Sequence, residues 1–145
     1  MATIQAREDI NNEPFVLDDS AEVNDSLTLA ANQGALTRGA ALGEVTSSGE
    51  LAVVDGTATD GSQIPKYLLA DESVPANTGA TQTISGYTAG LFDEDQISFA
   101  STATTLTTQV VLSTDDSISS SMKDILRTYG IRTAPVISEG GLENA

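Results

Sequence analysis

Short apolar stretches separated by turn residues occupy the middle of the chain. Apolar residues dominate before and after the tetrapeptide Thr46-Ser47-Ser48-Gly49, whose small polar residues and glycine are typical of a hairpin turn. Two Asp-Gly pairs then mark further turns before apolar sequence resumes. Close spacing of this kind predicts an antiparallel β meander rather than strands alternating with helices. The expected strands are residues 36–45, 50–54 and 64–70.

The alternation continues in the second half of the chain. Residues 80–87 place Gln82, Ile84 and Gly86 on one face, which predicts a strand. The Thr- and Val-rich composition of segment 104–112 predicts a strand. Residues 131–137 give a last extended segment, in which Pro135 indicates an edge position or a bend. Between the strands, the polar segment 71–79 contains Pro75 and is expected to be a surface loop.

One helix is expected, at about residues 116–129. Acidic residues lie near its start and basic residues toward its end, as the helix dipole favours, and Gly130 is placed to end it. The apolar stripe of this helix is expected to pack against the sheet. Its members are Ile118, Met122, Ile125, Leu126 and Tyr129.

The first 35 residues differ from the rest of the chain. Acidic residues interrupt every apolar cluster there except residues 15–17. Isolated apolar groups in an acidic segment bury too little surface to offset the ordering of the backbone. We therefore expect residues 1–35 to form an N-terminal arm that is mobile when free and orders on a partner. Residues 36–138 are then the β-rich domain, and residues 139–145 a loose C-terminal tail.

Composition restricts the chemistry that the chain can perform. A chain of 145 residues is one domain, and it contains neither cysteine nor histidine. Disulfides, thiolate nucleophiles, His-led metal sites and Ser-His or Cys-His catalysis are therefore excluded for this chain alone. These absences argue against an enzyme, and the absence of cysteine suits synthesis in a reducing cytoplasm.

The formal net charge is −15, with six basic residues scattered along the chain. An excess of carboxylates repels phosphate backbones, so we expect no nucleic-acid partner. We interpret the charge as keeping an abundant protein soluble. No segment is long and apolar enough for a membrane span, and the N-terminus lacks the pattern of a secretory signal, so we expect no membrane partner.

Acidic residues can act as metal ligands or as catalysts. Asp93, Glu94 and Asp95 are three adjacent carboxylates that could suit Ca²⁺, but adjacent residues point in different directions, and a solvated turn or short helix start is favoured. Phe92, Ile97 and Phe99 around them are expected core residues. A glycosidase would need two carboxylates in a cleft lined by aromatic residues, which make up only 4% of this chain. We therefore expect no catalytic residues, no metal and no cofactor.

The order of these features resembles the lambda-type bacteriophage head decoration protein D family. The resemblance begins at Thr46-Ser47-Ser48-Gly49-Glu50-Leu51-Ala52-Val53-Val54-Asp55-Gly56-Thr57-Ala58-Thr59-Asp60-Gly61 and the apolar run at 64–70. It continues through residues 86–99 into the final helix and tail. Shorter members of the family lack room for segment 104–112, which implies that this segment is an additional hairpin arm or edge strand. The resemblance implies a mainly β fold like that of decoration protein D, a small β-barrel or meander with one C-terminal helix packed on it and a mobile N-terminal arm.

The resemblance also implies a function and partners. Members of the family bind the outer surface of the expanded phage head as homotrimers, at three-fold and quasi-three-fold sites, and stabilise it. The partners implied are the major capsid protein and other copies of this chain, and the location is the virion surface. The capsid contact of the family lies in its N-terminal arm. The corresponding candidates here are Ile4, Ile10, Phe15, Val16 and Leu17.

An alternative function belongs to another class of protein. An outward-facing β module could recognise a glycan or protein on the host surface. Such a module is expected to carry a cluster of exposed aromatic side chains on its loops. The three Tyr and three Phe residues of this chain fall mostly in predicted strands and the helix.

Overall fold

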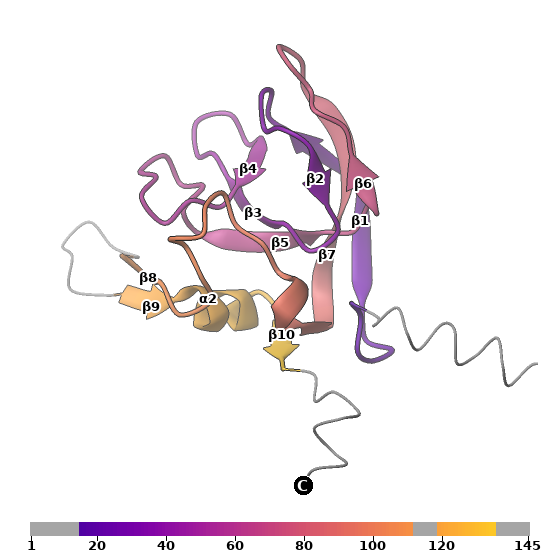
Figure 1. The fold of residues 1–145 in the computed structure, drawn as a ribbon, viewed down its shortest axis with the longest axis vertical. Helices are drawn as coiled ribbons and strands as arrows, with labels where there is room; N and C mark the ends of the chain where they lie inside the picture. The colour runs from indigo at the N-terminus through magenta and orange to yellow at the C-terminus, as the bar shows by residue number, and fades with distance from the viewer. Residues whose placement is uncertain (1–14, 112–118, 136–145) are drawn as a thin grey trace, which may run out of the picture.

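A computed structural model describes residues 15–111 and 119–135 of the chain (Figure 1). The fold is mainly β, with 43% of residues in strands and 9% in helices, and it confirms the predicted class. One 3₁₀ helix, η1 (Glu94–Gln96), and one α-helix, α2 (Met122–Thr128), complete the described elements. The strands are β1 (Glu22–Leu29), β2 (Leu36–Thr37), β3 (Ala41–Glu44), β4 (Leu51–Val53), β5 (Pro65–Leu69), β6 (Ser73–Val74), β7 (Gln82–Asp93), β8 (Gln109–Val111), β9 (Ser119–Ser121) and β10 (Ile131–Ala134).

Five strands close into a small barrel in the order β1-β4-β3-β5-β7, and β1 pairs with β7 to complete it. The predicted meander forms its centre, because β3 pairs with both β4 and β5 in antiparallel register. Gly49 has a φ of +75° in the turn between β3 and β4, a conformation that a glycine adopts without steric cost. β10 adds to β7 in parallel, outside the barrel, and so occupies the predicted edge position.

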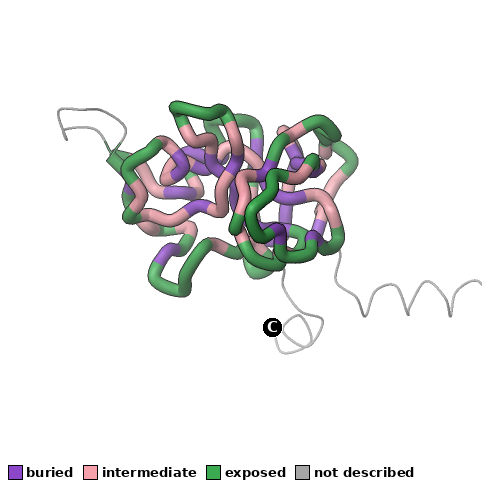
Figure 2. Tube along the Cα trace, turned by 90° about the horizontal axis from the view of Figure 1, so that it is seen from above, coloured by how far each residue is buried: buried purple, intermediate pink, exposed green. Residues whose placement is uncertain are grey.

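The central strands bury both of their faces. One face fills the barrel, where Leu42, Leu69 and Ile84 belong to a common cluster. The opposite face of the same strands is covered by α2, and there Leu68 and Tyr87 pack with the helix residues. The alternation of side chains along a strand thus supplies two apolar clusters from one sheet. Figure 2 shows the buried residues inside the body and the exposed residues mainly on its loops.

Two glycines permit close approach within the barrel. A Cβ on Gly43 would meet the backbone carbonyl oxygens of Ser62 and Ile64, at the irregularity where β3 changes register against β5. A Cβ on Gly86 would lie 2.7 Å from a methyl carbon of Leu27. Neither position has room for a side chain, so glycine there lets neighbouring segments pack together.

The helix is shorter than predicted and begins later. α2 begins at Met122, because Ser119–Ser121 pair with β8 as strand β9. Met122, Ile125 and Leu126 are buried, which confirms the expected packing against the sheet, whereas Tyr129 is 43% exposed and does not belong to the core. The predicted helix residues 116–118 lie outside the described residues. Gly130 follows the helix with a φ of +90°, as expected for its end.

The prediction of an N-terminal arm over residues 1–35 does not fit residues 15–35. Residues 22–29 form β1, which pairs with β7 along most of its length. Leu29 is fully buried and Leu27 packs against the same cluster, while Glu22 and Asp25 are exposed. Glu22 and Asp25, two of the acidic residues that interrupt apolar sequence, are therefore exposed positions of a strand. Residues 1–14 lie outside the described residues.

Three other segments differ in detail from the prediction. Residues 36–45 form two short strands rather than one, and the expected loop 71–79 contains β6, which pairs with β2. The amide of Asn77 is buried in that loop and donates to the carbonyl oxygens of Ala30 and Ala80. Of the described residues 104–111, only those of β8 form a strand, and β8 pairs in antiparallel register with β9, whose residues were expected in the helix.

Candidate functional site

The first and last described residues, Phe15 and Pro135, lie near the C-terminal end of β7. On one side of β7, Val16 forms an antiparallel bridge with Phe92, and the Asp93 backbone N–H donates to the Phe15 carbonyl at 2.9 Å. On the other side, Ala134 of β10 is paired with Asp93. We call this region, residues 15–17, 91–96 and 131–135, the attachment end. Residues 1–14 and 136–145 join the body there.

Phe15 belongs to the core of the protein. Its ring centroid lies 5.0 Å from that of Phe92 and 5.8 Å from that of Tyr87. The ring centroids of Tyr87 and Phe92 are 4.7 Å apart. Only 5% of Phe15 is exposed. Its side chain therefore anchors the N-terminal segment to the body and presents no apolar surface to a partner, which corrects its assignment as part of a mobile arm.

The residues after Phe15 are also held by the body. The Leu17 backbone N–H donates to the Leu91 carbonyl at 2.8 Å, and Val16 packs against the core while remaining partly exposed. Val16 and Leu17 thus lie at the attachment end as two partly exposed side chains. Ile4 and Ile10, the other two candidates, lie outside the described residues. Binding of a partner by any of these residues stays a prediction.

A turn at Asp18 closes the N-terminal segment against β10. Asp18 Oδ1 accepts hydrogen bonds from the Ser20 hydroxyl at 2.6 Å and the Ser20 backbone N–H at 2.9 Å. These bonds, with a smaller contribution from the positive charge of Arg132, hold the pKa of Asp18 below its usual value. Arg132 Nη2 lies 3.3 Å from Asp18 Oδ2. The entry of the chain into β1 is therefore fixed relative to β10.

The three adjacent carboxylates at the attachment end have separate surroundings. Asp93 is buried and accepts from the Asp95 backbone N–H and from Gln96 Nε2. Glu94 forms an ion pair with Lys123 at 3.1 Å and accepts from the Thr133 hydroxyl. Asp95 is exposed and makes no ion pair with a described residue. The short helix start expected here is η1, and within residues 15–111 and 119–135 no group of acidic residues could hold a metal ion.

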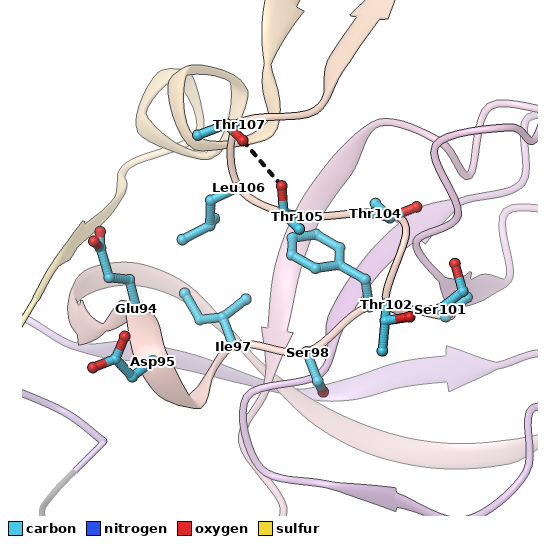
Figure 3. Close-up of a pocket in the computed structure, with 12 residues that line it drawn as sticks. Glu94, Asp95, Ile97, Ser98, Ser101, Thr102, Thr104, Thr105, Leu106 and Thr107 are labelled. Carbon is cyan, nitrogen blue, oxygen red and sulfur yellow. Dashed lines mark hydrogen bonds between the residues drawn. The ribbon is translucent and has the colours of Figure 1, made fainter.

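An open groove of about 650 Å³ lies beside η1 (Figure 3). Ile97 and Phe99 line it from one segment and Leu106 from another, and Glu94 and Asp95 stand at one end. The three apolar residues are partly buried and pack against the main core. The remaining lining consists largely of serine and threonine side chains between residues 98 and 107.

Sequence reasoning identified Ile97 and Phe99 as core residues, which the structure confirms in part, but it missed the groove. The available signal was Leu106, an isolated large apolar residue among the serine and threonine residues of segment 101–108. The composition of this segment predicts a strand. In the structure, residues 101–108 form turns instead, and these turns carry Leu106 to the groove.

All six aromatic residues lie in the described part of the chain, and they do not form an exposed cluster. Phe15, Tyr87 and Phe92 form the core triplet, and Phe99 and Tyr67 are partly buried. Tyr129 alone is exposed, and Lys66 Nζ lies 5.7 Å from the centre of its ring. The expected signature of a glycan-binding module is therefore missing. Among the described residues, no helix has the length and apolarity needed to cross a membrane.

Comparison with known proteins gives one family. The family model described as bacteriophage lambda head decoration protein D matches residues 5–113 of the chain. This match includes the barrel, the groove and ten of the fourteen residues that precede Phe15. No curated protein sequence matches the chain.

Proposed function

Because the chain belongs to the bacteriophage lambda head decoration protein D family, a family of structural proteins of the phage head, we propose that it is a cementing protein. In this proposal, three copies form a homotrimer that binds the outer surface of the expanded head at three-fold and quasi-three-fold sites. The partner is the major capsid protein. Bound trimers join neighbouring shell subunits and stabilise the expanded shell.

The observation that carries the proposal is the family match over residues 5–113. In this proposal, the body serves as a rigid platform and the N-terminal segment contacts the shell. The body buries its apolar residues in two clusters, which suits a rigid platform. Residues 1–14, with Ile4 and Ile10, are the candidate contact with the shell, and Val16 and Leu17 are candidates at the point where this segment meets the body.

Avidity supplies the physical basis for cementing. Each short segment buries little apolar surface and binds weakly on its own. Three such segments on one rigid trimer bind to a lattice of matching spacing about 10² to 10⁴ times more tightly than a single segment does. A segment that adds a strand to a sheet edge of the shell would contribute main-chain hydrogen bonds as well.

The test compares the full chain with a variant that lacks residues 1–14. The deletion ends before Phe15, because removal of Phe15 and Asp18 would disturb the aromatic triplet and the contact with Arg132. Both proteins are incubated with expanded and unexpanded shells that lack decoration, and bound protein is measured by sedimentation. We expect the full chain to bind expanded shells selectively and the deletion to lower that binding about 100-fold or more.

A variant that lacks residues 136–145 is the matched control, since these residues also join the attachment end. It is expected to bind as the full chain does. Circular dichroism and urea unfolding verify that both truncated bodies remain folded. Equal binding of the full chain to both kinds of shell, or to neither, would overturn the cementing function, and full binding by the variant lacking residues 1–14 would overturn the role of that segment.

A further inference from the structure

The groove beside η1 lies at the attachment end. Glu94, at one end of the groove, accepts a hydrogen bond from the Thr133 hydroxyl of β10. The backbone N–H of Asp93, the preceding residue, donates to the Phe15 carbonyl. The groove is therefore next to the point where residues 1–14 join the body. If those residues contact the shell, the groove lies near the origin of that contact.

The groove combines an apolar floor with an unneutralised negative charge. Ile97, Phe99 and Leu106 retain partial exposure, so they still offer apolar surface to an occupant. The charge of Glu94 is compensated by Lys123 at 3.1 Å, whereas Asp95 makes no ion pair with a described residue. Serine and threonine hydroxyls along the walls can donate to and accept from a peptide backbone (Figure 3). An occupant that complements these features has a bulky apolar side chain and a nearby positive charge.

Both terminal segments of this chain contain more acidic than basic residues. Residues 1–14 contain Glu8, Asp9 and Glu13 against the single basic residue Arg7. Residues 136–145 contain two glutamates and no basic residue. Other copies of the chain have the same net charge of −15, which disfavours a segment of another copy as the occupant of an acidic groove without preventing trimer contacts elsewhere. Charge complementarity therefore favours a different protein as the occupant.

We propose that this groove is a second docking site for the major capsid protein. It takes an extended segment of a shell subunit, whose bulky apolar side chain packs on Ile97, Phe99 and Leu106 and whose Lys or Arg approaches Asp95. This inference rests on the proposed cementing function. The groove contact adds to the contact of residues 1–14, so each subunit of the trimer holds the shell at two neighbouring places.

The charged part of the site is tested by Asp95→Lys. Asp95 is exposed and its carboxylate has no partner in the described body, so we expect the change to leave the fold intact. We expect about tenfold weaker binding to expanded shells at low salt, and a smaller loss at high salt, where charges are screened. Glu50→Lys makes the same change of charge in the turn between β3 and β4, outside the groove, and is expected to leave binding within about twofold of the unmodified chain.

The apolar part is tested by Leu106→Ser, with Val111→Ser as the matched control. Val111 is 44% exposed and does not line the groove. Leu106→Ser is expected to weaken shell binding about tenfold at every salt concentration, because the lost contact is apolar, and Val111→Ser to leave it unchanged. Urea unfolding of each variant verifies that the body is folded.

The outcomes separate this inference from the function on which it rests. Failure of the unmodified chain to bind expanded shells would overturn both. Normal binding by Asp95→Lys and Leu106→Ser, with loss of binding on removal of residues 1–14, would overturn the groove contact and leave cementing in place. A loss with Asp95→Lys that Glu50→Lys reproduces would show a general charge effect and would also overturn the groove contact.

Discussion

Three aspartates in this molecule close turns by the same local arrangement. Asp18, Asp55 and Asp60 each accept hydrogen bonds from the backbone N–H and the hydroxyl of the Ser or Thr two residues later. The bonds to the ionised form hold the pKa of each of these carboxyls below its usual value of 3.8. Ionisation of these aspartates is thus linked to the folded state.

The linkage predicts acid sensitivity that is specific to these turns. Since the folded pKa of Asp60 is lowered, mainly by the Ser62 hydroxyl, its contribution to stability is complete above pH 3.8 and is lost as the pH falls through the folded value. We expect Asp60→Asn to lower the free energy of unfolding at neutral pH, and we expect this difference to shrink as the pH falls below 3.8. Urea unfolding across this pH range measures the difference.

The comparison between the two proteins cancels the general effect of acid. Protonation of the many other carboxylates relieves repulsion in both proteins alike, so the difference isolates Asp60. Ser62→Ala removes the hydroxyl donor and should reduce the same pH-dependent difference. A difference between Asp60→Asn and the unmodified protein that stays constant with pH would contradict the linkage.

The sequence predicts some residues of the core but not all of them. Phe92, Ile125 and Leu126 were expected in the core because each lies in a clear apolar pattern, and all three are buried. Phe15 was assigned to an arm because the sequence around it is acidic. Its burial depends on Tyr87 and Phe92, more than seventy residues away in the sequence, and no local pattern reveals such a contact.

At the scale of elements, α2 shows how a helix of seven residues is stabilised by its neighbours. Its first backbone N–H groups have no partner within the helix. Met122 and Lys123 donate instead to the carbonyl oxygens of Thr108 and Leu106, and the Asp124 N–H donates to the Ser121 hydroxyl at 3.2 Å. The turns that form one wall of the groove therefore also determine where the helix begins.

The cap at Ser121 leads to a prediction for stability. Ser121→Ala removes the acceptor for the Asp124 N–H and is expected to lower the free energy of unfolding by about 1 kcal/mol. Ser119→Ala, in the same strand but without a capping bond, is expected to change it by less than about 0.5 kcal/mol. Urea unfolding of the two variants gives the comparison, and equal effects would mean that the loss at Ser121 comes from the β8–β9 pairing.

Local signals explain which elements the sequence predicted. The β3–β4 hairpin follows from a turn at 46–49 between two apolar stretches, and its register has Leu42 opposite Val53. The start of α2 was misplaced because a strand at 119–121 depends on pairing with β8. β1 was missed for a related reason, since only its partner β7 shows which of its side chains are buried.

For the whole molecule, the strand topology determines where the two ends of the described chain lie, and the net charge affects how copies associate. The barrel fixes the ends of the described chain at one end of β7, and the family match identifies a phage head decoration protein, which binds a capsid. Neither the barrel nor the groove could be derived from periodicity alone, because both depend on contacts between distant segments. The net charge of −15, in contrast, is fully readable from the sequence and opposes self-association.

Electrostatic repulsion between the subunits predicts how the proposed trimer responds to salt. Bringing together three subunits that each have a charge of −15 costs electrostatic energy, and salt reduces this cost by shortening the screening length from about 10 Å at 0.1 M to about 3 Å at 1 M. We expect the trimer fraction at a fixed protein concentration to rise with salt in analytical ultracentrifugation. The groove contact at Asp95 has the opposite dependence, because screening weakens attraction between unlike charges. A trimer that dissociates as salt is added would instead indicate an interface held by ion pairs. A monomer at all salt concentrations would remove the avidity on which cementing depends.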